Sequence, residues 1–283
     1  MIKAYSQLLK FRLSFLVAFS SAIGYGLGTS HPTWSNVALI MLAGLLVTGS
    51  ANTINQVLEI DRDKLMKRTA HRPLPEGRIG AGHALAFAAV IGVVGLTILA
   101  WRFNATAAAL SLVSLILYAF IYTPLKSVTP LCVAVGAIPG GMPPMIGYVA
   151  AQASGIIGVE AWVLFGIQFM WQFPHFWAIA WVLDDDYKAA GFRMLPFDGA
   201  KDMRTAFQIM IYTLVLLPVS LLPLLLRMSG STYAMIAIVC GVLFLAQTFY
   251  LMLTCTKKAA MNIMFGSFLY LPIVQIALVF DKI

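Results

Sequence analysis

Three oxygen-bearing side chains stand four residues apart in the first third of the chain: Asn55, Glu59 and Asp63. On a continuous helix this spacing puts them on one stripe. Aligned carboxylates repel each other unless a cation lies between them, and Mg²⁺ is usually held by one or two carboxylates together with substrate phosphates. Arg68 and Arg72 follow in the same segment and could grip phosphate oxygens. The pattern therefore predicts a magnesium and diphosphate site.

The alternative interpretation of this segment is a solvated loop whose mixed charges mark a membrane surface. That interpretation leaves the amides of Asn52 and Asn55 unexplained. Both lie inside an apolar stretch, where each amide needs a hydrogen-bond partner.

A second acidic group follows an aromatic stretch further along the chain. The three adjacent carboxylates of residues 184–186 are predicted to lie at the C-terminal end of a helix, where the helix dipole disfavours negative charge. A divalent ion would offset this cost and the repulsion between the carboxylates. In the stretch before them, Trp171, Gln172 and His175 put polar and aromatic groups in an apolar helix, where polar groups are functional candidates. A hydrogen bond to a neighbouring helix is the equal alternative for His175, and packing or an interfacial belt is the alternative for the aromatic residues. The aspartates are Asp184, Asp185 and Asp186.

Two further segments have residues suited to the same chemistry. Tyr122 and Lys126 lie in a predicted turn, where the lysine either marks the membrane side or neutralises a leaving diphosphate. Residues 136–144, Gly-Ala-Ile-Pro-Gly-Gly-Met-Pro-Pro, place helix breakers in an apolar stretch. Breakers are tolerated in hydrocarbon where neighbours or a water-lined cavity satisfy the freed backbone groups, so they predict a central cavity, with a simple kink as the alternative.

The elements that position these residues are predicted to be membrane helices. The chain has 283 residues, of which 60% are hydrophobic and 11% charged, which is typical of a membrane protein. Apolar runs of about 20 residues fit helices, whereas a barrel needs alternating segments of about ten residues. We expect an all-α integral membrane protein with one domain over residues 1–283. The nine predicted spans lie near residues 13–30, 36–58, 82–102, 104–123, 129–151, 159–183, 204–227, 232–254 and 259–280.

Charge distribution predicts the orientation. With the N-terminus inside, all of the 19 Lys and Arg residues except Arg102, Arg227 and Lys282 fall on the cytoplasmic side, as the positive-inside rule requires. This accounts for the net charge of +8 without a nucleic acid partner and predicts a multi-pass inner-membrane protein whose first apolar run is a spanning helix. The three cysteines have no metal or disulfide spacing. Most acidic residues cluster in the predicted cytoplasmic loops 59–81 and 184–203: Glu59, Asp61, Asp63, Glu76, Asp184, Asp185, Asp186, Asp198 and Asp202.

From about residue 5 onward the chain resembles the UbiA superfamily of intramembrane prenyltransferases, and within it the members that farnesylate protoheme IX. The resemblance is most specific in residues 52–74, 122–126, 136–144, 171–176 and 185–195. It implies nine helices around a central cavity, with two acidic motifs facing each other through Mg²⁺ and diphosphate. It also implies transfer of farnesyl from farnesyl diphosphate to a vinyl group of heme B, with addition of water, to give heme O.

The resemblance matches Asn55, Glu59 and Asp63 to the first acidic motif, and Tyr122 with Lys126 to the loop that contacts diphosphate. Glu59 stands where many members carry Asp, but its longer side chain still offers an oxygen.

The second motif departs from the family pattern, which is two aspartates separated by three residues. Asp185 and Asp186 are the expected metal ligands, but the residues four before them are Trp181 and Val182. Which of the three aspartates reaches the metal is therefore left open. Two other positions that differ from the residues expected in the family are Ser127 and Cys132.

We expect Mg²⁺ and the cations Arg68, Arg72 and Lys126 to stabilise the charge on departing diphosphate, so that the allylic carbon ionises in a dry cavity. The heme vinyl group then attacks that carbon.

His175 is a candidate axial ligand of heme, with Trp171 and Gln172 as further heme-binding candidates, although an aromatic slot could hold the porphyrin without a ligand.

The rival functions are a quinone-pathway prenyltransferase with an aromatic acceptor and a secondary transporter. A transporter is expected to place its carboxylates near the midplane, whereas here they crowd one face. Heme A synthase or a terminal oxidase is the expected protein partner.

Overall fold

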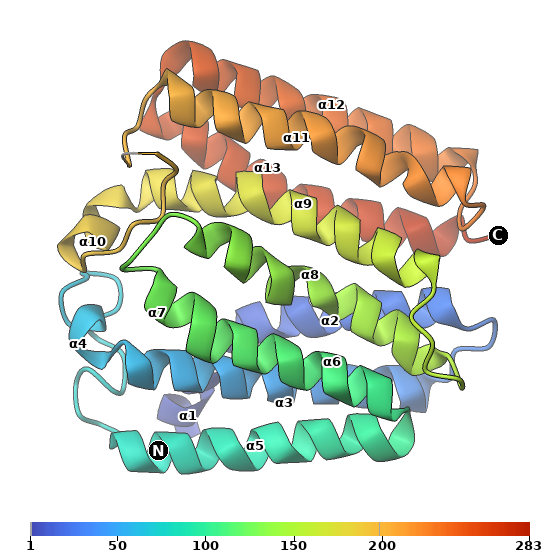
Figure 1. The fold of residues 1–283 in the computed structure, drawn as a ribbon, viewed down its shortest axis with the longest axis horizontal. Coiled ribbons are helices and arrows are strands. Elements are labelled where there is room, and N and C mark those ends of the chain that lie inside the picture. Colours follow the sequence, from blue (N-terminus) through green and yellow to red (C-terminus); the bar gives the residue numbers. More distant parts are fainter. Residues whose placement is uncertain (1, 198) are drawn as a thin grey trace.

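A computed structural model describes residues 2–197 and 199–283. Asp198, one of the clustered carboxylates, lies outside the described residues. The described chain forms long helices joined by short turns and by two longer loops (Figure 1). The long helices are α2 (Phe11–Gly28), α3 (Trp34–Leu58), α5 (Ala81–Arg102), α6 (Ala105–Ile116) with its continuation η1 (Leu117–Tyr122) and α7 (Thr123–Leu125), α8 (Cys132–Ala151), α9 (Val159–Val182), α11 (Met203–Leu225), α12 (Ser231–Thr254) and α13 (Lys257–Phe280).

Eight of these helical segments are long and apolar enough to cross a membrane, so the chain is a multi-pass membrane protein. The remaining long helix, α9, has 24 residues, but its Trp, Gln, His and Pro residues make it less apolar. Each predicted span corresponds to one long helical segment, with ends that differ by three residues or fewer.

Three short helices were not predicted from the sequence. They are α1 (Ile2–Leu9), α4 (Ile60–Asp63) and α10 (Asp184–Ala189). Between α1 and α2 the backbone of Lys10 takes the left-handed conformation, with φ of 47°, which turns the chain before the first long helix. The turn in η1 has π-helical hydrogen bonding, a local widening that is frequent at functional sites.

The long helices run roughly side by side, and the termini lie at opposite ends of the bundle (Figure 1). Helix α8 is central, since it packs against α2, α6 and α9, while α5 and the α11–α12 pair lie at the outer edges. Helices α2 and α8 touch through glycines. A Cβ atom on Gly24 would collide with the carbonyl oxygen of Pro144, and one on Gly147 would collide with that of Ser21. Only residues without side chains allow the two backbones to come this close.

Candidate active site

The predicted stripe of Asn55, Glu59 and Asp63 is present even though the helix is interrupted within it. Helix α3 ends at Leu58, and Glu59 leaves helical geometry with φ of −106° and ψ of 14°. The backbone bonds nevertheless continue at the helical spacing, from the Glu59 amide to the Asn55 carbonyl at 3.1 Å and from the Asp63 amide to the Glu59 carbonyl at 2.7 Å. All three side chains are at most 5% exposed. The stripe therefore forms one buried polar cluster at the end of α3.

Two cations neutralise the carboxylates of this cluster. The Lys126 Nζ donates to Glu59 Oε1 at 2.8 Å, and the Arg72 guanidinium donates to Asp63 Oδ2 at 2.8 Å. The Asn55 amide donates to the other Glu59 oxygen at 3.0 Å. Because buried carboxylates are costly unless they are paired, these contacts offset the burial of the two carboxylates.

Lys126 reaches the cluster from the turn after η1, which the sequence had predicted to contact diphosphate. Its ammonium group also lies 4.7 Å from the centre of the Tyr122 ring, in cation–π geometry. Tyr122 and Lys126 are both buried, at 5% and 8% exposure. The turn is therefore part of the site and not only a topology signal.

Lys10, which was not predicted as a site residue, also contacts the acidic cluster. Its Nζ donates to Asn55 Oδ1 at 3.3 Å. Burial, followed by repulsion from Arg72 and Lys126, lowers the pKa of Lys10 to about 7. From sequence alone Lys10 is one of several basic residues before the first span, and no spacing distinguishes it from Arg12.

The amides of Asn52 and Asn55 have the partners that their position in an apolar helix requires. Asn52 donates to Ser14 Oγ at 3.2 Å and accepts from the Tyr118 hydroxyl at 3.3 Å. Asn55 also donates to Thr123 Oγ1 at 3.0 Å. These bonds join α2, α3 and the α6–α7 segment around the acidic cluster.

The second acidic group lies in a different local structure from the one predicted. The expectation that the three aspartates load the C-terminal end of a helix is wrong, because α9 ends at Val182 and Asp184 begins the new helix α10. In the first turn of α10 the helix dipole favours negative charge. The run is therefore less costly than the sequence indicated.

The three aspartates also differ in environment. Asp184 is buried and pairs with Lys188 at 2.8 Å and Lys201 at 3.1 Å. The Asp185 side chain is 90% exposed and lies 3.8 Å from Lys201. Asp186 is partly buried. Of the two predicted metal ligands, Asp186 is thus the one shielded from solvent.

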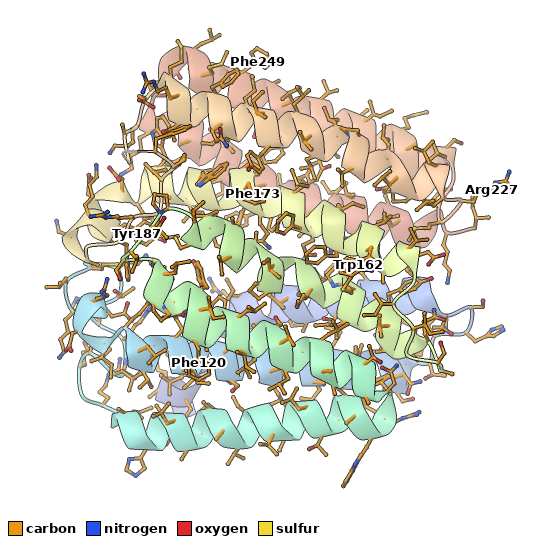
Figure 2. All side chains as sticks on the ribbon, in the orientation of Figure 1. Phe120, Trp162, Phe173, Tyr187, Arg227 and Phe249 are labelled. Atoms are coloured by element: carbon orange, nitrogen blue, oxygen red, sulfur yellow. The ribbon has the colours of Figure 1, made fainter. Side chains whose placement is uncertain are left out.

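Both acidic loops lie at the same end of the bundle, where Figure 1 shows α4 and α10. The Arg193 amide donates to the Lys126 carbonyl at 2.7 Å, and the Arg62 guanidinium lies 5.3 Å from the Phe192 ring centre. Tyr187 is labelled at this end in Figure 2, and Arg227 at the opposite end. The segment after α10 therefore contacts the segments that carry the first motif.

Tyr187 is close enough to both acidic groups for their charges to act on its hydroxyl. Burial raises its pKa, with Arg68 and Arg72 acting in the opposite direction and the carboxylates of Glu59 and Asp186 adding to the rise.

The two arginines predicted to bind phosphate differ in environment. Arg72 forms an ion pair with Asp63, whereas Arg68 is exposed.

The first motif offers a donor set suited to Mg²⁺. Asp63 Oδ1 is a buried oxygen without a hydrogen-bond partner in the described residues, and Asp63 is on the same helical stripe as Glu59 and Asn55. Buried polar atoms are normally satisfied, so an unpaired carboxylate oxygen is consistent with a cation ligand. Across residues 2–197 and 199–283, no three His, Cys, Asp or Glu side chains converge as a preformed metal site. A metal here would therefore need the amide oxygen of Asn55, substrate oxygens or movement of the second motif.

An apolar pocket of about 280 Å³ lies beside this cluster. Asn52 lines it, and Asn55 follows three residues later, about 4.5 Å further along the helix axis. The pocket thus comes within one helical turn of Asn55, and Glu59 follows about 10 Å from Asn52 along the helix axis. All three heme-binding candidates predicted from the sequence line it, together with other aromatic residues: Trp171, Gln172, His175, Phe176, Tyr118 and Phe268.

His175 makes the interhelical hydrogen bond that the sequence left as an alternative. Its Nδ1 lies 2.8 Å from Ser267 Oγ on α13. Its ring stacks on Trp171 with centroids 4.3 Å apart, and the Trp171 Nε1 donates to the Ser267 carbonyl at 2.9 Å. His175 is 9% exposed. Trp171 and His175 are therefore held as one unit against α13.

Gln172 has a structural role that the sequence did not show. Pro144 has no N–H to donate to the carbonyl of Gly140, four residues earlier in α8. The side-chain amides of Gln168 and Gln172 donate to that carbonyl instead, at 2.7 and 3.1 Å. Ser114 Oγ likewise donates to the Pro139 carbonyl at 3.3 Å. Neighbouring helices thus satisfy the backbone that the prolines free, which is one of the two ways in which such breakers are tolerated; the central cavity predicted from this stretch stays a prediction.

Comparisons with known proteins agree with this architecture. Residues 17–271 match the model of the UbiA prenyltransferase family. The chain is 55% identical over 282 residues to the protoheme IX farnesyltransferase of Cytophaga hutchinsonii, an alignment that covers 99% of this chain and 98% of that protein. Its fold is similar to that of a digeranylgeranylglyceryl phosphate synthase, with a TM-score of 0.78 at 18% identity over 99% and 98% of the two chains. It is also similar to a UbiA homolog from Archaeoglobus fulgidus bound to DMAPP and Mg²⁺, with a TM-score of 0.69 at 17% identity over 98% and 99% of the chains.

Proposed function

Because the chain belongs to the UbiA prenyltransferase family, we propose that it transfers farnesyl from farnesyl diphosphate to a vinyl group of protoheme IX (heme B), with addition of water and release of diphosphate, giving heme O. The observation that carries this proposal is the buried cluster of Glu59 and Asp63 with Lys126 and Arg72, on the same helical stripe as Asn52, which lines an apolar pocket. Full-length relatives named protoheme IX farnesyltransferase support the same reaction.

We assign Mg²⁺ binding to the first motif together with the second. Asn55, Glu59 and Asp63 would hold the metal from one side, with Asp186, and Asp185 after a rearrangement, from the other. When bound, Mg²⁺ supplies electrophilic stabilisation of the leaving diphosphate. The Archaeoglobus fulgidus homolog of this fold was solved with DMAPP and Mg²⁺, which supports the assignment.

The diphosphate would be bound by cations that the structure shows on the carboxylates. Lys126 and Arg72 each pair with one carboxylate of the cluster, and each would exchange that partner for phosphate oxygens when diphosphate binds. Arg68 is exposed beside them, and Tyr122 lies under the Lys126 ammonium. These groups stabilise the charge that develops on the leaving group as the allylic carbon ionises.

The apolar pocket would receive the substrates, with His175, Trp171 and Gln172 on the heme side. Its volume of about 280 Å³ is at the low end for ligand pockets, so the pocket as it stands does not enclose both substrates. Leu13 and Leu16 on α2 line it and are 49% and 51% exposed, so it opens toward the lipid-facing surface. An apolar substrate in the bilayer could enter there, and its far end would stay in lipid.

We propose the membrane arrangement on the same basis. Helix α9 is about 36 Å long, enough to cross a hydrocarbon core of about 30 Å, which would make nine crossings in a single domain over residues 1–283. Nine crossings put the termini on opposite sides, in agreement with their positions in Figure 1. The distribution of Lys and Arg favours a cytoplasmic N-terminus in the inner membrane, with the acidic loops on the cytoplasmic face. Heme A synthase or a terminal oxidase is the partner to which heme O would pass.

The direct test is heme O formation from heme B, farnesyl diphosphate and Mg²⁺ by the purified chain and its Asp63→Asn variant. Loss of a metal-binding and charge-stabilising group should lower turnover by about a hundredfold or more. The matched control is Asp61→Asn, because Asp61 is in the same short helix α4 but is exposed and paired with Lys64. Full turnover by Asp63→Asn would contradict the assignment, and prenylation of 4-hydroxybenzoate in place of heme B would favour the quinone-pathway alternative.

A further inference from the structure

Ser267 on α13 determines which nitrogen of His175 carries the proton. The Ser267 hydroxyl donates to the Met264 carbonyl at 2.6 Å, and that oxygen can only accept. A hydroxyl has a single proton, so toward His175 the Ser267 oxygen must act as acceptor. The contact of 2.8 Å between Ser267 Oγ and His175 Nδ1 is therefore an Nδ1–H donor bond.

The other ring nitrogen of His175 is consequently left as a lone pair. In neutral imidazole one nitrogen donates and the other accepts, so protonation at Nδ1 leaves Nε2 unprotonated. No hydrogen bond to Nε2 is present in the described part of the chain. His175 is more than nine-tenths buried and lines the apolar pocket, so its unpaired Nε2 is an atom able to bind a metal beside a cavity that has few polar groups.

The ring is held rigidly in this arrangement. Trp171 stacks on it at 17° between the planes, and Phe268 meets it edge-on at 5.2 Å. Trp171 is itself fixed by its bond to the Ser267 carbonyl. Ser267 thus contacts both rings, through its hydroxyl and through its backbone. A histidine that ligates a metal commonly donates its second N–H to such an outer partner, which sets its tautomer and orientation.

We propose that Ser267 is a positioning residue for heme binding, which holds His175 in the Nδ1–H form so that Nε2 is presented to the heme iron. The proposal rests on the proposed function in that heme is the substrate occupying this pocket. It deepens that function by naming the residue that prepares the iron ligand. Without the Ser267 hydroxyl, Nδ1–H loses its acceptor, and the ring can shift its proton to Nε2, which then no longer binds iron.

The test is a titration of heme B into the purified full-length chain in detergent, followed by Soret absorbance and by electron paramagnetic resonance of the ferric complex. We expect an imidazole-ligated spectrum for the unmodified chain and its loss in His175→Ala. Ser267→Ala should weaken heme binding about 10- to 100-fold, as loss of an outer-shell partner commonly does. Ser267→Thr keeps the hydroxyl and should restore binding. Ser267→Cys, which keeps the volume but accepts hydrogen bonds weakly, should behave like Ser267→Ala.

The matched control is Ser220→Ala. Ser220 is also buried and hydrogen-bonded, to the Tyr270 hydroxyl at 2.7 Å, but it does not line the pocket. Its heme affinity and spectrum should be unchanged. The proposal would be overturned if Ser267→Ala and Ser267→Cys both bound heme with the affinity and the spectrum of the unmodified chain. It would also be overturned if His175→Ala kept the spectrum of the unmodified chain. Failure of the unmodified chain to form heme O would instead refute the proposed function, and the binding series would still report on Ser267.

Discussion

The buried pair of Glu59 and Lys126 can be tested by removing each charge alone and then both. The carboxylate and ammonium groups are 2.8 Å apart, with side chains 7% and 10% exposed. Truncating one partner of a buried ion pair typically costs 3–5 kcal/mol, because the other charge stays buried without compensation. Here the Asn55 amide remains on Glu59 and still partly compensates its charge. We therefore expect about 3 kcal/mol of destabilisation for Lys126→Met, at the low end of that range.

The assay is thermal unfolding in detergent of Glu59→Gln, Lys126→Met and the double variant. A loss of about 3 kcal/mol corresponds to a fall in Tm of about 6 °C for a chain of this size. The double variant should lie within about 1 kcal/mol of the unmodified chain, since it has no uncompensated charge. Lys64→Met is the control, because its exposed pair with Asp61 should contribute less than about 1 kcal/mol. If the double variant loses the sum of the two single losses, the pair does not interact and the reasoning is refuted.

Three further outcomes follow from the packing and the helix ends. Gly147→Ala should lower thermal stability by about 1–3 kcal/mol, because the added methyl group forces α2 and α8 apart, and an unchanged Tm would contradict the close approach. Replacing Gln168 and Gln172 together by Leu should cost more than the two single replacements added, since only the double variant leaves the Gly140 carbonyl without a donor; additive losses of Tm would argue against this. The Thr205 backbone N–H donates to the Asp202 carboxylate at the start of α11 and lowers the pKa of Asp202. The stabilisation from this cap is therefore present above the ordinary pKa of a carboxyl group and is lost as pH falls through the lowered value. Asp202→Ala should lower Tm at neutral pH and less at low pH, and an equal loss at both would refute the charge-based cap.

The sequence predicted the long helices and the first acidic motif because both depend on local spacing. Apolar runs of membrane length indicate helices directly, and residues four apart share a helix face whatever the rest of the fold does. The stripe of Asn55, Glu59 and Asp63 survives even the break at Glu59, since the backbone bonds keep the same spacing.

The residues that were missed or misread depend on contacts between distant segments. Lys10 joins the site only because the backbone turns before α2, and its position among the basic residues gives no sign of that. The Gln172 side-chain amide donates to the Gly140 carbonyl on another helix. Predicting this bond requires knowing how α8 and α9 align along their axes, which cannot be read from local spacing in one sequence. The aspartates were assigned to the end of α9 because nothing in their spacing predicts the new helix at Asp184.

The two buried ion pairs, Glu59 with Lys126 and Asp63 with Arg72, determine how metal binding and diphosphate binding would depend on each other. The four groups sum to no net charge, so a divalent metal arriving alone would leave an excess of two positive charges in a buried region. Diphosphate arriving alone would leave an excess of negative charge. Metal and diphosphate together come closest to electroneutrality, so their binding is expected to be strongly cooperative.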